Sequence, residues 1–219
     1  MLNQEEEGYF MLLIKYLENP CGTSSIPYWK QQVISIPENI KIYHEKIFNQ
    51  IEVKPLHIEK YFRLIHYLNE ISEPNPMIET IDINNDLHEL ITLINFCYAD
   101  QQISVDEDDV NDWLNRKVYH SNLWVKIVLN QEIIATGIAE YDSDAEEGVL
   151  EWIQVNPKYH GKGYGKMIVD ELINRLSGIS RFITVSGKLD NKTNPEILYR
   201  RCGFVGHDVW YVCKISDGE

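Results

Sequence analysis

Three glycines at alternate positions mark the segment of this chain with the clearest capacity for chemistry. The segment reads His160-Gly161-Lys162-Gly163-Tyr164-Gly165-Lys166 and joins an extended apolar run, which ends at Val155, to an apolar pattern with helical spacing. Backbone N–H groups at a helix start lack intrahelical acceptors and carry the positive end of the helix dipole, and glycine lets an anion approach them. The segment is therefore predicted to bind a phosphate or pyrophosphate through its main chain.

Two common phosphate-binding motifs do not match this segment. A Walker A loop needs a glycine where the chain has His160 and a Ser or Thr where it has Met167. A dinucleotide-binding GxGxxG motif beginning at Gly161 would need a third glycine at the position of Lys166. A glycine turn that binds nothing is the simpler alternative, but glycine costs conformational entropy and is rarely kept three times without a reason.

Two short segments together resemble the GCN5-related N-acetyltransferase (GNAT) family. The family's cofactor motif is Gln/Arg-x-x-Gly-x-Gly/Ala, and here His160 precedes Gly163 and Gly165 at that spacing. A second family signature, a Leu-Tyr followed by a Gly-Phe, is present as Leu198-Tyr199-Arg200-Arg201-Cys202-Gly203-Phe204. The resemblance covers residues 77–215 and implies an α/β (α+β) fold with a mixed, mostly antiparallel central sheet flanked by helices.

The resemblance also implies acetyl-CoA as a co-substrate, bound between two splayed parallel strands, with no metal. The backbone of residues 153–155 would pair with the pantetheine arm, and the glycine segment would hold the pyrophosphate. Where many members have a cofactor-contacting Asn, this chain has Lys192, flanked by Asn191 and Asn194, and the contact is given to Asn194. The implied cofactor-binding residues are Ile153, Gln154, Val155, His160, Gly161, Lys162, Gly163, Tyr164, Gly165, Lys166 and Asn194. Because His160 replaces the usual Gln or Arg, we expect a less firmly ordered loop whose main-chain donors remain.

The predicted reaction is direct attack of a neutral amine on the thioester, which needs one acid and one base. The resemblance implies Tyr199 as the general acid, and a phenol keeps its proton at neutral pH and can donate it to a forming thiolate. Carboxylates on the predicted strands, Glu140, Asp142 and Glu151, are the candidates for the base. Strand parity places Glu151 on the same face as Ile153, and it is the carboxylate proposed here, although each of the three could equally be a solvated surface group.

Periodicity and turn signals predict the elements that must position these residues. Before a proline-rich stretch at Pro74 and Pro76, we expect a small mixed module with helices over 7–17 and 58–71 and short strands over 34–36 and 40–43. After it, strands are predicted over 77–83, 123–129, 132–141, 149–155, 182–186 and 209–215, and helices from Asp86 to Tyr98 and over 105–117, 165–176 and 196–201. The chain is thus divided into an N-terminal module, residues 1–76, and an acetyltransferase domain, residues 77–219.

Composition limits the partners and the location. The 219 residues carry 20 Lys and Arg against 34 Asp and Glu, a formal net charge of -14, which repels nucleic acid and weakly favours a cationic acceptor. No apolar run approaches the ~20 residues that span a membrane, so no membrane contact and a cytoplasmic location are expected. The four cysteines are widely spaced, as in a protein with reduced thiols. A homodimer is left open, because the strand over 209–215 could serve an interface or only a core.

These observations predict an acetyl-CoA-dependent N-acetyltransferase whose acceptor is an amine of a small molecule, a peptide or a protein. The alternative is a non-catalytic acetyl-CoA-binding module with a regulatory role, in which the fold and the cofactor loop persist without transfer.

Overall fold

One mixed sheet runs through the computed structural model, which describes residues 13–23, 37–48, 50, 55–101 and 103–216. Within these residues the sheet has the strand order β1-β8-β2-β7-β6-β5-β4-β3, and β6 and β7 are its one parallel pair. The strands are β1 (Ile40–His44), β2 (His57–His66), β3 (Ile78–Thr80), β4 (Trp124–Leu129), β5 (Glu132–Asp142), β6 (Glu147–Val155), β7 (Phe182–Lys188) and β8 (Val205–Lys214). The predicted α/β fold with a mostly antiparallel sheet is confirmed.

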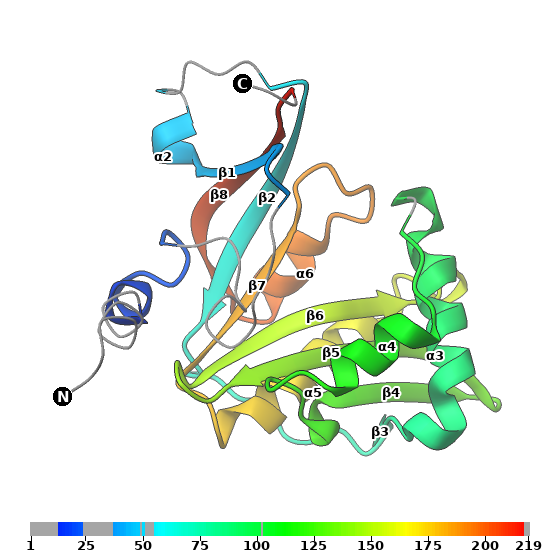
Figure 1. Ribbon diagram of the computed structural model, residues 1–219. Helices are drawn as coiled ribbons and strands as arrows, with labels where there is room; N and C mark the ends of the chain where they lie inside the picture. The colour runs from blue at the N-terminus through cyan, green and yellow to red at the C-terminus, as the bar shows by residue number, and fades with distance from the viewer. Residues whose placement is uncertain (1–12, 24–36, 49, 51–54, 102, 217–219) are drawn as a thin grey trace.

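Helices cover both faces of this sheet (Figure 1). Apolar residues of α5 (Tyr164–Ser177) recur every three or four positions and pack on one face, where they join a cluster with residues of β4, β5, β6 and β7. On the other face, α3 (Ile83–Tyr98) and α4 (Glu107–Leu114) pack around three tryptophans, Trp113, Trp124 and Trp152. The remaining α-helical segments of the described residues are α2 (Glu45–Phe48), α6 (Pro195–Arg201) and residues 13–18. None of the helices in the described part of the chain is long and apolar enough to cross a membrane.

The strands predicted after residue 123 are confirmed with shifts of a few residues at their ends, and so is the helix that follows the glycine segment. The first helix of this region begins earlier than expected, at Ile83, because the side chain of Asp82 accepts the backbone N–H of Asn84 and caps it. Asp86, where the helix was predicted to begin, instead accepts the backbone N–H of Asp82 and binds Lys126 at 2.6 Å. The predicted strand over 34–36 and residues 7–12 of the first predicted helix lie outside the described residues.

The helix predicted over 58–71 is wrong, because residues 57–66 form β2. This strand pairs antiparallel with β7 on one side and with β8 on the other, and five successive residues, 62–66, are buried. Because Arg63 and His66 are buried along with Phe62, Leu64 and Ile65, the apolar residues of this strand do not alternate with polar ones as in a half-exposed strand. β2 lies inside the same sheet as the strands of residues 77–219, and the division of the chain at residue 76 stays a prediction.

Candidate active site

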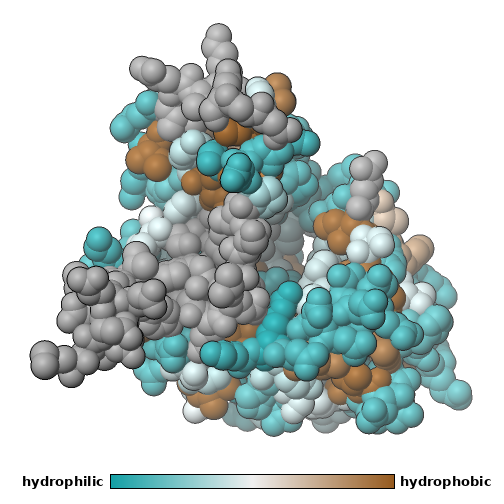
Figure 2. Space-filling model, viewed as in Figure 1, coloured by the Kyte–Doolittle hydropathy of each residue, from teal (hydrophilic) through white to brown (hydrophobic). Residues whose placement is uncertain are grey.

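The parallel strands β6 and β7 separate halfway along their length. Their pairing runs from Glu147 opposite Phe182 to Leu150 opposite Val185 and stops there. Beyond this point β6 stays with β5, whereas β7 continues beside β2. The two strands diverge in Figure 1, and the surface is hollowed between the part that holds β1, β2 and β8 and the part that holds α3 (Figure 2). The chain therefore contains a splayed parallel pair of the kind that the resemblance implies.

A β-bulge lies on β6 where the separation begins. The partners of Leu150 and Ile153 on β5 are only two residues apart, so β6 carries one extra residue at Glu151 and Trp152. Leu150 and Ile153 both pack toward α5, while Trp152 packs among the tryptophans under α3 and α4. The strand-parity argument that placed Glu151 on the face of Ile153 and Val155 is therefore wrong, because a bulge shifts the alternation of side chains.

The glycine loop leads directly into α5, and its three glycines have different reasons to be glycine. Gly161 and Gly163 have φ angles of 75° and 90°, in the left-handed region that favours glycine, and a Cβ at either would meet no atom within 4 Å. At Gly165 a Cβ would lie 3.2 Å from Leu198 and 3.6 Å from Val155, so glycine lets α5 approach α6 and β6. Gly163 caps α5 without a side chain, which leaves the first N–H groups of the helix uncapped before open space.

His160 fastens the start of this loop to the end of β6. Its Nε2 lies 2.8 Å from the carbonyl oxygen of Val155, so Nε2 carries the proton and donates it. The Cys97 thiol donates to the same oxygen at 3.5 Å. The histidine that replaces the family's Gln or Arg therefore has a defined partner, and the carbonyl of Val155 has both of its lone pairs in use.

Tyr199 lies on α6 beside the splayed strands, packed between the rings of Phe62 and Phe204 with centroids 6.2 Å and 5.8 Å away. Only 5% of the residue is exposed, and its hydroxyl has no hydrogen-bond partner among the described residues. Burial raises the pKa of this phenol well above its ordinary value, and the nearby Tyr98 and Glu151 raise it further. The phenol keeps its proton at neutral pH and has no described acceptor within the chain to receive it.

Tyr98, at the end of α3, is a second phenol of this site that sequence reasoning missed. Burial raises its pKa, followed by the effects of Cys97 and Glu151, and its ring packs edge-on against Trp152 at 5.3 Å. Because Tyr98 and Glu151 both act on the pKa of Tyr199, the three groups lie within electrostatic range of one another. They come from α3, β6 and α6, and no local sequence signal links the end of α3 to the other two.

The two other candidate bases have structural partners of their own. Glu140 is buried and binds Arg116 at 3.0 Å. Asp142 is also buried, and its Oδ1 accepts the backbone N–H groups of Asp144 and Ala145 in the β5–β6 hairpin. Of the three strand carboxylates, Glu151 is the one that borders the separation of β6 and β7.

The side chains of two lysines near the loop contact other residues of the chain, and Asn194 lies at the start of α6. Lys166 binds Asp170 at 2.5 Å, which raises the pKa of the ammonium, and Lys162 lies 5.1 Å from the centre of the Tyr159 ring. Asn194 has a left-handed φ of 47° at the start of α6, and its side chain makes no capping hydrogen bond. The main-chain donors of the loop thus remain its main feature for an anion.

Comparison with known proteins agrees with this geometry. Residues 120–206 match the family model described as an acetyltransferase (GNAT) domain. These residues include the strands β4 to β7, the glycine loop, α5 and α6 with Tyr199. Residues 120–206 of this chain are thus similar to a GNAT acetyltransferase domain. A comparison with the curated proteins found no match.

Solved structures of this family share the fold. A GCN5-related N-acetyltransferase from Sphaerobacter thermophilus aligns with a TM-score of 0.62 and 14% identity over 82% of this chain, which spans 61% of that chain's length. A GNAT-family acetyltransferase from Colwellia psychrerythraea aligns with a TM-score of 0.60 and 10% identity over 98% of this chain and 74% of that one. A third, from Kribbella flavida, gives a TM-score of 0.55 at 9% identity, over 81% of this chain and 68% of that one. At these identities the likeness concerns the fold.

Proposed function

We propose that this protein transfers an acetyl group from acetyl-CoA directly to an amine. One observation supports the proposal: β6 parts from β7 just before Glu151, the glycine loop and α5 follow the end of β6, and Glu151 lies within electrostatic range of Tyr199. An anion-binding helix start, an extended strand edge and an acid beside a carboxylate are what acyl transfer from a CoA thioester requires.

The residues fit the cofactor as follows. The uncapped N–H groups of the loop and of the first turn of α5, residues 161–166, hold the pyrophosphate, and the open space before Gly161 and Gly163 leaves room for it. The backbone of residues 153–155 faces the pantetheine arm. Since His160 and Cys97 already occupy the carbonyl of Val155, Ile153 and Gln154 carry more of that pairing. Asn194 remains the proposed side-chain contact.

The reaction needs a base that accepts a proton from the amine and an acid that donates a proton to the departing sulfur. As the amine nitrogen bonds to the acetyl carbon, the carbon–sulfur bond breaks. Glu151 accepts the proton that the amine loses, and Tyr199 donates its hydroxyl proton to the departing sulfur. The raised pKa of Tyr199 ensures that this proton is present. No covalent bond to the enzyme and no metal ion enters this scheme.

The first test is thermal unfolding with and without acetyl-CoA, with NAD and ATP as controls. Acetyl-CoA at about 100 times its dissociation constant stabilises the folded chain by about 2.7 kcal/mol, which is roughly 5 to 10 °C in Tm for a chain of this size. A shift with acetyl-CoA alone is expected. Equal shifts with all three ligands, or none with acetyl-CoA, would contradict the proposed binding loop.

Binding alone does not separate the enzyme from a non-catalytic acetyl-CoA-binding regulatory module. Release of CoA in the presence of a panel of primary amines separates them, because transfer frees one thiol for each amide formed. A Tm shift without CoA release for any amine would favour the regulatory module.

A further inference from the structure

Ser186 occupies a special position on β7. It is the first residue beyond the pairing with β6, and it is exposed, whereas the four residues before it are buried. It pairs across the sheet with Arg63 of β2, so its side chain lies on the same face as those of Arg63 and Thr184. Ile183 and Val185, its alternate neighbours, face the α5 cluster instead. The Ser186 hydroxyl therefore lies on the sheet face opposite α5, where β6 and β7 part.

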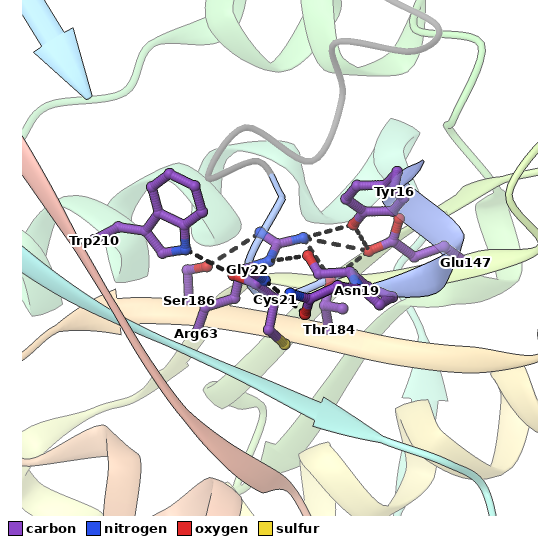
Figure 3. A network of polar contacts seen from close by, with 10 residues as sticks. Tyr16, Asn19, Cys21, Gly22, Arg63, Glu147, Thr184, Ser186 and Trp210 are labelled. Atoms are coloured by element: carbon purple, nitrogen blue, oxygen red, sulfur yellow. Dashed lines mark hydrogen bonds and ion pairs between the residues drawn. The ribbon is translucent and has the colours of Figure 1, made fainter. Parts of the chain in front are cut away.

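A buried arginine holds this hydroxyl in place (Figure 3). Arg63 is 1% exposed, and its Nη1 donates to Ser186 Oγ at 3.4 Å. The same guanidinium donates from Nε to the carbonyl of Pro20 and from Nη2 to the hydroxyl of Tyr16, and it lies 3.5 Å from Glu147. These partners hold the guanidinium in one position, so the oxygen of Ser186 is used as an acceptor on its inner side.

The Ser186 hydroxyl can still donate a hydrogen bond. Among the residues that the structure describes, no acceptor lies within hydrogen-bond distance of this O–H. A hydroxyl whose oxygen accepts from a charged donor is a stronger donor itself. Glu151 holds the equivalent place on β6, one residue beyond the last pair with β7, so a carboxylate and a hydroxyl donor stand on the two sides of the separation.

Resting on the proposed function, we propose that Ser186 selects the acceptor by donating a hydrogen bond to an oxygen next to the reacting amine. The amine lies at Glu151 and the oxygen at Ser186, which fits a compound with an amine and a carbonyl on adjacent atoms. The charge of Arg63 is already paired with Glu147. Lys188, which lies on β7 two residues after Ser186, binds Glu59 at 2.5 Å. With both cations engaged, the site suits the neutral carbonyl of an amino-acid amide or a peptide N-terminus better than the carboxylate of a free amino acid.

The test compares two amines of nearly equal shape, alaninamide and sec-butylamine, which differ by the amide group. We expect Ser186→Ala to lower kcat/KM for alaninamide about tenfold, the loss of one hydrogen bond, and to leave kcat/KM for sec-butylamine unchanged. Ser186→Thr keeps the hydroxyl and should keep the preference. For each protein we take the ratio of kcat/KM for the two amines. Because the two amines differ in basicity by the same amount in every protein, this difference cancels when the ratios are compared.

Ser180→Ala is the matched control, because it also removes a serine hydroxyl, one that bonds the carbonyl of Leu176 behind α5. It should not change the ratio. An equal loss for both amines in Ser186→Ala, or an unchanged ratio, overturns the role of Ser186 while the proposed transfer stands. Acetylation of other amines but of neither test amine by the unaltered protein overturns it too. No acetylation of any amine overturns the proposed function itself.

Discussion

Two clusters, each with a buried tyrosine and a glutamate, lie on opposite sides of the point where β6 leaves β7, and they differ in how the tyrosine hydroxyl is used. In the first, Tyr16 donates to Glu147 at 2.6 Å and accepts from Arg63 at 2.7 Å (Figure 3). In the second, the hydroxyl of Tyr199 has no partner among the described residues, although the residue is 5% exposed. Burial raises the pKa of both phenols.

The difference separates a structural cluster from the cluster that we propose to be catalytic. A buried polar group whose hydrogen bonds are made stabilises one arrangement of the chain, and here it joins residues 13–22 to the middle of the sheet. The hydroxyl of Tyr199, which makes no hydrogen bond within the described residues, remains able to donate to a ligand. The same residue types therefore contribute to stability on one side and are available for chemistry on the other.

Tyr199→Phe should produce the largest effect. Removing the general acid is expected to lower kcat about 10²- to 10⁴-fold, while Tm changes little, since no hydrogen bond within the described residues is lost. Steady-state release of CoA and thermal unfolding measure the two quantities. Tyr98→Phe is the control, because it removes the other phenol of the same site. If Tyr98→Phe loses more activity than Tyr199→Phe, the acid is Tyr98.

Glu147→Ala should affect stability instead. Removing the carboxylate leaves the charge of Arg63 buried without its counterion, and we expect a loss of about 3–5 kcal/mol in the free energy of unfolding. Denaturant titration measures it. The neighbouring Glu146 is exposed, and Glu146→Ala should cost far less. Equal losses in the two variants would show that the cluster around Arg63 does not stabilise the sheet.

The pH dependence of transfer should show the smallest change. Because burial raises the pKa of Tyr199 above its ordinary value of 10.0, the acid stays protonated through pH 10, and no alkaline fall of kcat is expected below that pH. The profile of kcat between pH 7 and 10, with acetyl-CoA saturating, tests this. A fall in kcat with a midpoint below pH 10 that disappears in Tyr199→Phe would mean that the phenol titrates as an exposed one.

Much of the fold was predictable because its signals are local. Gly161 and Gly163 need left-handed backbone, and the apolar spacing after Gly165 needs a helix, so the loop and α5 could be read along the chain. The strands from residue 124 to 155 alternate or end at turns and were placed to within a few residues. The assignment of β2 to a helix failed because its burial on both faces depends on β7 and β8, which follow more than a hundred residues later.

The residues of the candidate site likewise fall into those that the sequence revealed and those that only the structure revealed. The motif residues, His160 to Lys166 and Tyr199, were identified from the sequence, and the structure places them at the start of α5 and on the neighbouring helix α6. Tyr98, Ser186 and the partners of Arg63 could not be found, since nothing near them in the sequence marks them. The orientation of Glu151 was also beyond reach, because the bulge that decides it depends on the register with β5.

The sequence by itself indicated the resemblance to the GNAT family, the glycine loop before α5 and the candidate acid, because glycine conformation and helix starts depend on residues only a few positions apart. The tertiary structure alone decided where β6 parts from β7, which hydroxyls are paired and which are left free. These properties depend on strand pairing and burial between segments far apart in the chain, as between Tyr16, Arg63 and Glu147. Long-range pairing, and not residue type, therefore distinguishes the structural tyrosine, Tyr16, from the proposed acid, Tyr199.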